Sequence, residues 1–435
     1  MSTILLTLGM LLTPPQDSAA AWPRFMGPSG TGAVEVGELN FEWGEAGPEV
    51  LWRVELGEGF GGVAVDGDEV FLLDREVGEM DILRVLDAKT GADLWDQAYE
   101  AEGRLQYPGS RSVPTLVGDY VVTMGGHGDV ACFNRKSRTL KWKLNVAEEF
   151  EGELPGYGWS NNPLVIGDMV VISVFGEDVG LVALDIATGE EIWATTPLGI
   201  SHSTPVLFNL LGEEQILFLS AGEQTTPRGE VGQVTVSSFD PESGELNWDA
   251  VVKGSRYPIP CPMQIDGERF FITGGYRGGS SMLKLSKSGG EYKLEEQFHI
   301  ELGSQMYAPI LRDGHLYYLV NENANHQRNL RKTGGLLCID LEGKEKWRTG
   351  DDPFLGRGNW IMGGPYLFLQ DGFNGSLVVC KASPEGYEEL ANFNVFGVTD
   401  RKDHENWAPM ALVDGKLFLR SKNELACLNL RRAAE

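Results

Sequence analysis

Aromatic side chains and hydrogen-bonding side chains recur together just ahead of short apolar runs in this chain of 435 residues. Aromatic faces interleaved with amide, imidazole and guanidinium groups are typical of a site for a sugar, a planar ring or a peptide. The same residue types also fill the space between packed sheets, and the sequence supports the two interpretations about equally. The candidates are Tyr107, Arg111, Tyr157, Trp159, Asn161, His202, Arg256, Tyr257, Gln305, Tyr307, Arg357, Asn359, Trp360, Asn406 and Trp407.

Catalytic signatures are weak in the sequence. No G-x-S-x-G elbow, H-E-x-x-H pair or glycine-rich phosphate loop occurs, and the six histidines are scattered. Asp403 and His404 are adjacent and could act as an acid/base pair, but one such pair in a chain of this length is close to chance. The sequence therefore predicts no catalytic residue. It also predicts no metal site, because no spacing of cysteines or histidines fits a metal.

A repeated element must position these candidates. The stretch Asp185–Trp193 (DIATGEEIW) returns at Asp87–Trp95 and Asp240–Trp248, with weaker copies at Asn134–Trp142 and Asp340–Trp347. Its Asp can accept hydrogen bonds from backbone amides two residues on, its Gly can take a positive φ, and its Trp opens a new strand with an apolar anchor. A unit that recurs every ~40–55 residues cannot bury its own apolar face, so its copies must stack.

Each unit is interpreted as a four-stranded antiparallel sheet, because a second turn marked by Gly-Asp or Asp-Gly precedes the copies. We predict an all-β, eight-bladed β-propeller over residues 50–430, closed by Val50–Leu56 as the outer strand of the last blade. Two blades, around residues 260–300 and 360–396, lack the Trp. The inner strands are expected near Gly61, Pro114, Pro163, Pro205, Pro262, Pro309, Gly364 and Pro409.

Function is expected on the face that carries the long loops Ser220–Gly232, Asn321–Gly335 and Phe396–Asn406. The formal net charge of −27 argues against a nucleic-acid or anionic-membrane surface, because phosphate contacts need clustered Lys and Arg. This face could still be locally positive and attract carboxylates, although scattered solvated charges explain its basic residues somewhat better. Those residues are Arg104, Arg111, Arg228, Arg256, Arg277, Arg328, Arg331, Lys332, Arg357, Arg401 and Lys402.

The first 49 residues precede the repeats. Residues 1–21 combine a short apolar run, Ile4–Thr13, with small residues at Ser18–Ala21, which is typical of a signal peptide and too short for a membrane anchor. Residues 22–49 are rich in Pro, Gly and aromatic residues and are expected to form an ordered strap against the propeller. The mature protein is thus predicted to be an exported, periplasmic or extracellular monomer without membrane insertion.

The cysteines fit the same repeat. Cys132, Cys338 and Cys427 stand where the best-formed unit has Ala183, and Cys380 is expected at the same place. Equivalent points of different blades are too far apart for a disulfide, so these thiols should be small buried apolar groups.

The repeated D-x-x-[TS]-G-x-x-x-W pattern and its upstream apolar strand resemble the pyrroloquinoline-quinone (PQQ) repeat. The leader WPRFMGPSGTG is similar to that of exported bacterial PQQ-like propellers related to the outer-membrane assembly factor BamB. The resemblance covers nearly the whole chain. It implies either a quinoprotein dehydrogenase, with PQQ and calcium in the central funnel, or a non-catalytic scaffold protein.

This chain differs from both the dehydrogenases and the assembly factor. The dehydrogenases carry a disulfide between neighbouring cysteines, whereas no two cysteines of this chain are adjacent, and their calcium ligands and catalytic Asp have no match. The lipoprotein Cys of the assembly factor is absent too. The favoured expectation is an exported, non-catalytic propeller that binds a protein segment or a glycan of the cell envelope through its long-loop face, without a cofactor. The alternative is a PQQ-dependent oxidoreductase for alcohols or sugars, with arginines holding the cofactor's carboxylates.

Overall fold

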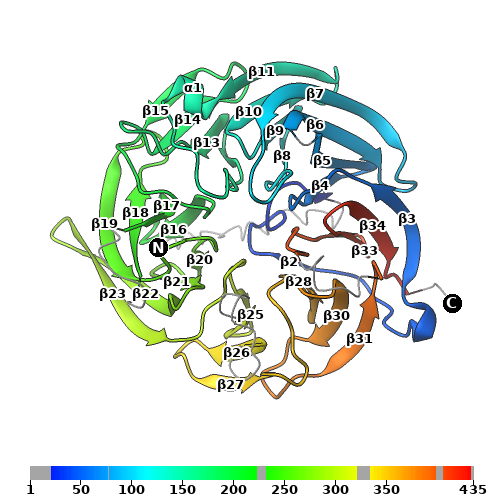
Figure 1. Cartoon of the computed structure of the whole chain (residues 1–435). Coiled ribbons are helices and arrows are strands. Elements are labelled where there is room, and N and C mark those ends of the chain that lie inside the picture. Colours follow the sequence, from blue (N-terminus) through cyan, green and yellow to red (C-terminus); the bar gives the residue numbers. More distant parts are fainter. Residues whose placement is uncertain (1–20, 77, 223–231, 321–333, 398–404, 433–435) are drawn as a thin grey trace, which may run out of the picture.

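Eight antiparallel sheets surround a central axis, with the inner strand of each sheet next to the axis and the outer strand at the rim (Figure 1). Each sheet contributes four strands to the ring, so the chain is an eight-bladed β-propeller, as the sequence predicted. Residues 1–20, which hold most of the predicted signal peptide, lie outside the described part. The computed structural model describes residues 21–76, 78–222, 232–320, 334–397 and 405–432.

The blades follow one another in chain order, and within each blade the strands are arranged from the axis outward. Blades 1 and 2 contain β4 (Val63–Asp66), β5 (Glu69–Glu76), β6 (Gly78–Asp87), β7 (Asp93–Gly103), and β8 (Thr115–Val117), β9 (Tyr120–Met124), β10 (Asp129–Asn134), β11 (Thr139–Asn145). Blades 3 and 4 contain β12 (Leu164–Ile166), β13 (Met169–Ser173), β14 (Leu181–Asp185), β15 (Glu191–Ala194), and β16 (Val206–Leu210), β17 (Glu213–Ala221), β18 (Gln233–Phe239), β19 (Leu246–Lys253).

The second half of the ring repeats this order. Blades 5 and 6 contain β20 (Met263–Gln264), β21 (Arg269–Gly274), β22 (Gly279–Ser288), β23 (Glu291–Ile300), and β24 (Ile310–Arg312), β25 (His315–Leu319), β26 (Leu336–Asp340), β27 (Glu345–Arg348). Blades 7 and 8 contain β28 (Asn359–Gly363), β29 (Tyr366–Gln370), β30 (Ser376–Lys381), β31 (Glu389–Asn394), and β32 (Ala411–Val413), β33 (Lys416–Arg420), β34 (Glu424–Asn429), β3 (Glu49–Glu55). The described helices are η1 (Gly44–Ala46) and α1 (Val146–Glu149).

The repeated motif forms the turn between the third and fourth strands of a blade. In blade 3, Asp185 Oδ1 accepts hydrogen bonds from the backbone N–H groups of Ala187 and Thr188 at 2.9 and 2.8 Å. Gly189 has a φ of 78°, a conformation that a Cβ disfavours. The Asp and the Gly therefore have the local roles predicted for them.

The Trp of the motif joins one blade to the next. Trp142 of blade 2 donates from Nε1 to the carbonyl oxygen of Ile186 in blade 3 at 2.8 Å. Its ring covers Gly189, where an added Cβ would be 2.7 Å from the indole. Trp193 makes the corresponding hydrogen bond to Pro241 of blade 4 at 3.2 Å. The Trp of one blade thus packs against the Gly in the turn of the next blade.

The two blades that lack this Trp use phenylalanine at the same joint. Phe298 of blade 5 lies against Gly343 of blade 6, where an added Cβ would be 2.6 Å from the ring. Phe393 of blade 7 lies against Gly47, a residue that precedes β3, at a corresponding 2.4 Å. The contact of an aromatic ring with a glycine, as at Trp142 and Gly189, is therefore repeated at these two joints.

The N-terminal strand completes the eighth blade, as predicted. β3 pairs antiparallel with β34 and places Trp52 opposite Cys427. Trp52 Nε1 donates to the carbonyl oxygen of Ala88 in blade 1 at 3.2 Å, so the aromatic joint continues across the closure. Arg53 adds an ion pair with Glu424 at 2.6 Å. The ring is therefore closed between its last blade and its first.

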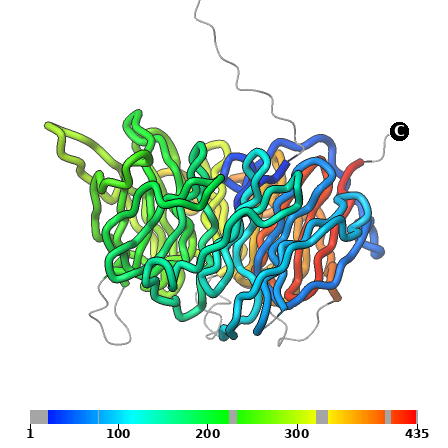
Figure 2. Tube along the Cα trace, turned by 90° about the horizontal axis from the view of Figure 1, so that it is seen from above, coloured from blue at the N-terminus to red at the C-terminus, as the bar shows by residue number. Residues whose placement is uncertain are grey.

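The leader enters the central channel. β1 (Ala21–Trp22) pairs with the inner strand of blade 1, and β2 (Ala33–Val34) pairs with the inner strand of blade 7. Between them, the carbonyl oxygen of Pro23 accepts a hydrogen bond from the N–H of Leu116 in blade 2 at 2.8 Å. Met26 packs in the core cluster that contains the inner strand of blade 6. Figure 2 shows the leader, in dark blue, at one end of the ring axis.

Two predictions of register were wrong. The inner strand of blade 7 ends just before Gly364, which instead begins the turn into β29 with a φ of 52° and Pro365 after it. Cys132 faces the Trp of its own blade, but Cys380 faces Glu389 and lies one position further along its strand. All five cysteines are nevertheless buried free thiols.

Candidate functional site

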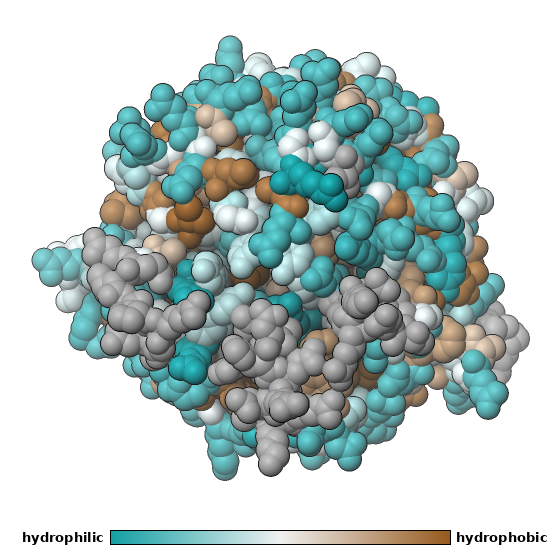
Figure 3. Space-filling view, in the orientation of Figure 1, coloured by the Kyte–Doolittle hydropathy of each residue, from teal (hydrophilic) through white to brown (hydrophobic). Residues whose placement is uncertain are grey.

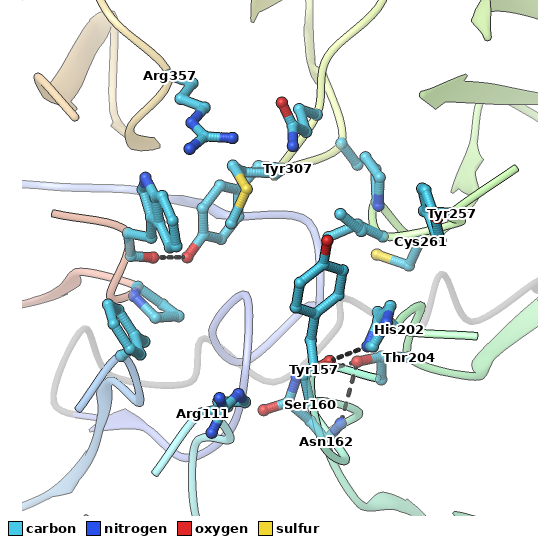
Figure 4. A pocket seen from close by; sticks show the side chains of 18 of the residues that line it. Arg111, Tyr157, Ser160, Asn162, His202, Thr204, Tyr257, Cys261, Tyr307 and Arg357 are labelled. Atoms are coloured by element: carbon cyan, nitrogen blue, oxygen red, sulfur yellow. Dashed lines mark hydrogen bonds between the residues drawn. The ribbon is translucent and has the colours of Figure 1, made fainter. Parts of the chain in front are cut away.

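A cavity of about 340 Å³ lies on the ring axis, on the face opposite the leader's entry. Its lining residues come from the segments that precede the inner strands of all eight blades, from the turn between β21 and β22, which holds Tyr276, and from the leader (Figure 4). In the space-filling view of this face, hydrophilic residues cover most of the visible outer part of the ring (Figure 3). The segments before the inner strands all lie next to the ring axis, so the fold brings together residues that are far apart in the sequence.

Six rings follow one another around the cavity, and we call them the aromatic arc. The centroids of successive rings are 5.1 to 6.3 Å apart, the spacing of aromatic pairs that contact one another. Burial raises the pKa of Tyr107 and Tyr276, so these hydroxyls stay protonated at neutral pH. The order along the arc is Phe60, Trp407, Tyr107, Tyr157, Tyr257 and Tyr276.

Two arginines stack on the arc. The guanidinium carbon of Arg357 lies 4.6 Å from the ring centroid of Trp407, and that of Arg256 lies 4.9 Å from the centroid of Tyr257. Within the described ranges, neither side chain forms an ion pair or donates a hydrogen bond. Stacking therefore fixes both guanidinium groups while their N–H donors remain available to a ligand.

Arg111 is held by hydrogen bonds. Its two terminal nitrogens donate to the carbonyl oxygens of Gly109, at 2.7 Å, and Tyr107. Burial, reinforced by the charge of Arg75, lowers its pKa to about 10, so it remains a cation at neutral pH. The lining contributed by described residues contains no Asp or Glu. The cavity is therefore a positive site in a protein of net charge −27.

One wall of the cavity is polar. Ser160 Oγ lies 3.0 Å from His202 Nδ1, and Asn162 Nδ2 donates to Thr204 Oγ1 at 2.9 Å. Burial, followed by the charge of Arg111, lowers the pKa of His202 to about 4. This imidazole is consequently neutral at physiological pH and accepts or donates hydrogen bonds without adding charge.

The leader supplies the floor. Phe25 lines the cavity, and its ring centroid lies 6.1 Å from that of Tyr307. The hydroxyl of Tyr307 donates to the carbonyl oxygen of Trp407. Cys261 also lines the cavity, where burial raises its thiol pKa to about 12 and keeps it protonated.

Five of the sequence candidates do not line the cavity. Trp159, Asn161, Asn359, Trp360 and Asn406 are at most 1% exposed. The two tryptophans belong to hydrophobic core clusters, and the side-chain amides of Asn161 and Asn359 donate to neighbouring segments of the ring. These five side chains therefore do not reach the cavity, because each is enclosed by the packed blades.

The candidates that do line the cavity are Tyr107, Arg111, Tyr157, His202, Arg256, Tyr257, Gln305, Tyr307, Arg357 and Trp407. Sequence reasoning missed Phe25, Phe60, Ser160, Asn162, Thr204, Cys261 and Tyr276. Phe60 precedes an inner strand, so the rule that found the others applies to it as well. Phe25 carries no repeat signal, because it comes from the leader.

Much of the predicted long-loop face falls outside the described residues. This applies to most of the three long loops, to the Asp403–His404 pair, and to Arg228, Arg328, Arg331, Lys332, Arg401 and Lys402. Of the basic candidates that are described, Arg111, Arg256 and Arg357 line the cavity, whereas Arg104 and Arg277 do not.

Comparisons with known proteins find a family model for part of the chain and solved structures with a similar fold. The family model described as outer membrane protein assembly factor BamB matches residues 78–235. BamB from Moraxella catarrhalis aligns with a TM-score of 0.56 at 12% identity, over 88% of this chain and 99% of that one. The matched stretch is less than half of the chain, and at this identity the likeness to BamB shows a shared propeller fold.

Other solved structures share the propeller fold. A europium-containing methanol dehydrogenase gives a TM-score of 0.66 at 12% identity, over 95% of this chain and 99% of that one. Quinohemoprotein alcohol dehydrogenase from Comamonas testosteroni gives 0.68 at 12% identity, over 95% and 81%. No curated protein sequence matches the chain. At this identity the likeness shows the fold alone, so function has to be argued from this propeller's own residues.

The residues of the described cavity do not fit calcium. Calcium in proteins takes six to eight oxygen ligands, with carboxylates prominent among them, and this lining contains no carboxylate. The described ranges also contain no group of three or more His, Cys, Asp or Glu placed to hold a metal ion. The arginines could bind the carboxylates of PQQ, but the calcium ion expected with PQQ has no carboxylate ligand in this lining.

Across the described ranges, no helix has the length and apolar character needed to cross a bilayer.

Proposed function

We propose that this PQQ-like propeller is a non-catalytic binding module of the cell envelope, whose axial cavity receives part of a partner molecule. The observation that carries the proposal is the combination of an aromatic arc with three arginines and no carboxylate in the lining of the described cavity. Such a surface binds a ligand by stacking and charge. The envelope assignment rests on the family model, whose description is that of an outer membrane protein assembly factor.

The polar wall argues against hydrolysis. Ser160 and His202 are within hydrogen-bond distance, as a nucleophile and its base would be. A base is most effective when its pKa lies near the working pH, and the pKa of about 4 makes His202 a weak one. The cavity lining of the described residues also offers no carboxylate to orient the imidazole. Binding therefore fits these residues better than acyl transfer does.

The test is retention of envelope components by the immobilised protein. We expect Tyr107→Ala and Trp407→Ala to lose the specifically retained protein or glycan, because both side chains belong to the aromatic arc. Tyr292→Ala, on the outer strand β23 of blade 5, is the matched control and should retain it. Equal retention by all three variants would exclude the cavity as the binding site.

A second measurement separates the quinoprotein alternative. The purified protein is titrated with PQQ in the presence of Ca²⁺, and dye-linked oxidation of alcohols and sugars is assayed. We expect neither a stoichiometric absorbance change nor turnover. Both together would establish the oxidoreductase and replace the binding proposal.

A further inference from the structure

The cavity is closed at one end by the leader. The leader makes hydrogen bonds to the inner strands of blades 1, 2 and 7, and Phe25 lies at the bottom of the lining. Trp22, which anchors the leader, is only 1% exposed, and Met26 is 4% exposed. In Figure 4 the leader ribbon runs behind the side chains of the site. A ligand that enters from the open face must therefore end inside the cavity, since the leader closes the axis behind it.

The positive charge of the cavity favours an anionic ligand. Arg357 and Arg256 form no ion pair within the described ranges, and Arg111 uses only part of its hydrogen-bonding capacity on backbone carbonyls. The charge of Glu405 acts on Arg357, but Glu405 is not part of the lining. A guanidinium group can donate five hydrogen bonds and matches a carboxylate in a two-pronged geometry. A carboxylate brought by the ligand would therefore offset the cost of holding the half-buried Arg357 partly away from water.

The cavity also holds a buried acceptor without a donor. Gln305 is 3% exposed and lines the cavity; its Nε2 donates to the hydroxyl of Tyr276 at 3.1 Å, while its Oε1 has no hydrogen-bond partner in the described structure. Buried polar atoms are normally paired, so this oxygen points to a ligand N–H group. A ligand with a carboxylate and an N–H close to it satisfies both the arginines and Gln305.

We propose that the cavity binds the carboxyl-terminal end of a polypeptide, an inference that rests on the proposed binding function. The terminal carboxylate lies at Arg357 and Arg256, the last backbone N–H donates to Gln305 Oε1, and the last side chain, apolar or aromatic, packs on the aromatic arc. A chain end is the part of a protein that combines a free carboxylate with a neighbouring amide, and capture of a terminal carboxylate is a known mode of peptide recognition. A volume of about 340 Å³ suits such an end and lies at the small extreme of ligand cavities.

The experiment is calorimetric titration of the full chain with four probes. The first is the acetylated tetrapeptide Ala-Ala-Leu-Phe with a free carboxylate. The second is the same peptide as a C-terminal amide, and the third has Gly-Ser-Gly-Ser added after the Phe. The fourth is benzoate. We expect the free acid to bind, and the other three to bind at least about 10-fold more weakly, because the second lacks the carboxylate, the third lacks an apolar side chain next to it, and benzoate lacks the amide.

Variants link the binding to the arginines. Arg357→Gln should weaken binding of the free acid by about 10- to 100-fold, the range for loss of charge-assisted hydrogen bonds. Arg269→Gln, at the start of β21 on the opposite face, removes a charge outside the cavity and should bind as wild type does. Circular dichroism checks that both variants are folded. If Arg357→Gln does not fold, Arg256→Gln, whose side chain is exposed at its stacking site, carries the same comparison.

The results that would overturn the inference are specific. Equal affinity for the acid and the amide would exclude a role for the terminal carboxylate, and equal affinity for benzoate would assign the site to small aromatic acids. If no peptide binds while the envelope component is still lost in Tyr107→Ala, the C-terminal inference fails and the binding function stands. If that retention fails as well, the proposed function fails with it.

Discussion

Replacing Asp81 with Asn should remove a pH dependence of stability from the propeller. Asp81 of β6 has no exposed surface, and its Oδ1 accepts a hydrogen bond from Arg75 Nη1 at 2.6 Å. Its Oδ2 has no partner in the described ranges, and Gly125 packs so closely that an added Cβ would be 2.2 Å from this oxygen. Burial therefore outweighs the guanidinium and raises the pKa of Asp81 from 3.8 to about 6.

The sign and the size follow from proton binding. Between pH 3.8 and about 6, the folded state keeps a proton on Asp81 that the unfolded state has released. The stability that this proton provides is fully present below pH 3.8 and is lost as the pH rises through about 6. A pKa difference of about two units, at about 1.4 kcal/mol per unit, lowers the free energy of unfolding by about 3 kcal/mol over that window.

The measurement is urea unfolding, followed by tryptophan fluorescence, from about pH 3.5 to about pH 7.5. The difference in unfolding free energy between wild type and Asp81→Asn should be about 3 kcal/mol more favourable to wild type at the acidic end of this range than at the other. Asp249→Asn, an exposed carboxyl on β19, is the control and should follow the wild-type profile. Parallel profiles for wild type and Asp81→Asn would refute the assignment of this titration to the buried pair.

Two further predictions concern the joints and the cavity. Gly189→Ala should destabilise the fold by about 1–3 kcal/mol more than Gly167→Ala, as measured by thermal unfolding. Both positions have positive φ, but only the first faces a ring, that of Trp142, at 2.7 Å. Binding of a carboxylate-ended peptide should be constant from about pH 5.5 to about pH 8.5, because His202 stays neutral with a pKa of about 4 and Arg111 stays charged with a pKa of about 10. A change in affinity inside that range, measured by calorimetry, would mean that another group titrates with binding.

The blades could be predicted because the turns that define them are local. An Asp that caps its own turn and a Gly with positive φ leave a signal within a short stretch of sequence, as Asp185 and Gly189 do. Strand counting then predicted the closure, since a four-stranded last blade needs β3. The error at Gly364 has the same origin, because a Gly-Pro turn was not among the signals used to place the hairpins.

The site could be predicted only in part, because side-chain direction depends on register. Ser160 and Asn162 line the cavity, whereas Asn161 between them points into the neighbouring blade. A shift of one residue reverses which side chains face the axis, and the sequence alone does not determine that parity where no turn is nearby. Phe25 could not be predicted for another reason. Its position depends on the leader entering the channel, and no sequence repeat marks that long-range contact.

The pairing of β3 with β34 also determines the order in which the newly made molecule becomes complete. The side chains of Glu49 and Asn429 are joined by a hydrogen bond of 2.7 Å, although 380 positions separate them in the sequence. During biosynthesis β3 is the first strand of the ring to be made, and β34 is the last. Contacts of such long range form late, and unpaired strands are prone to aggregation until they do. Closure of the ring therefore has to wait until β34 has been made.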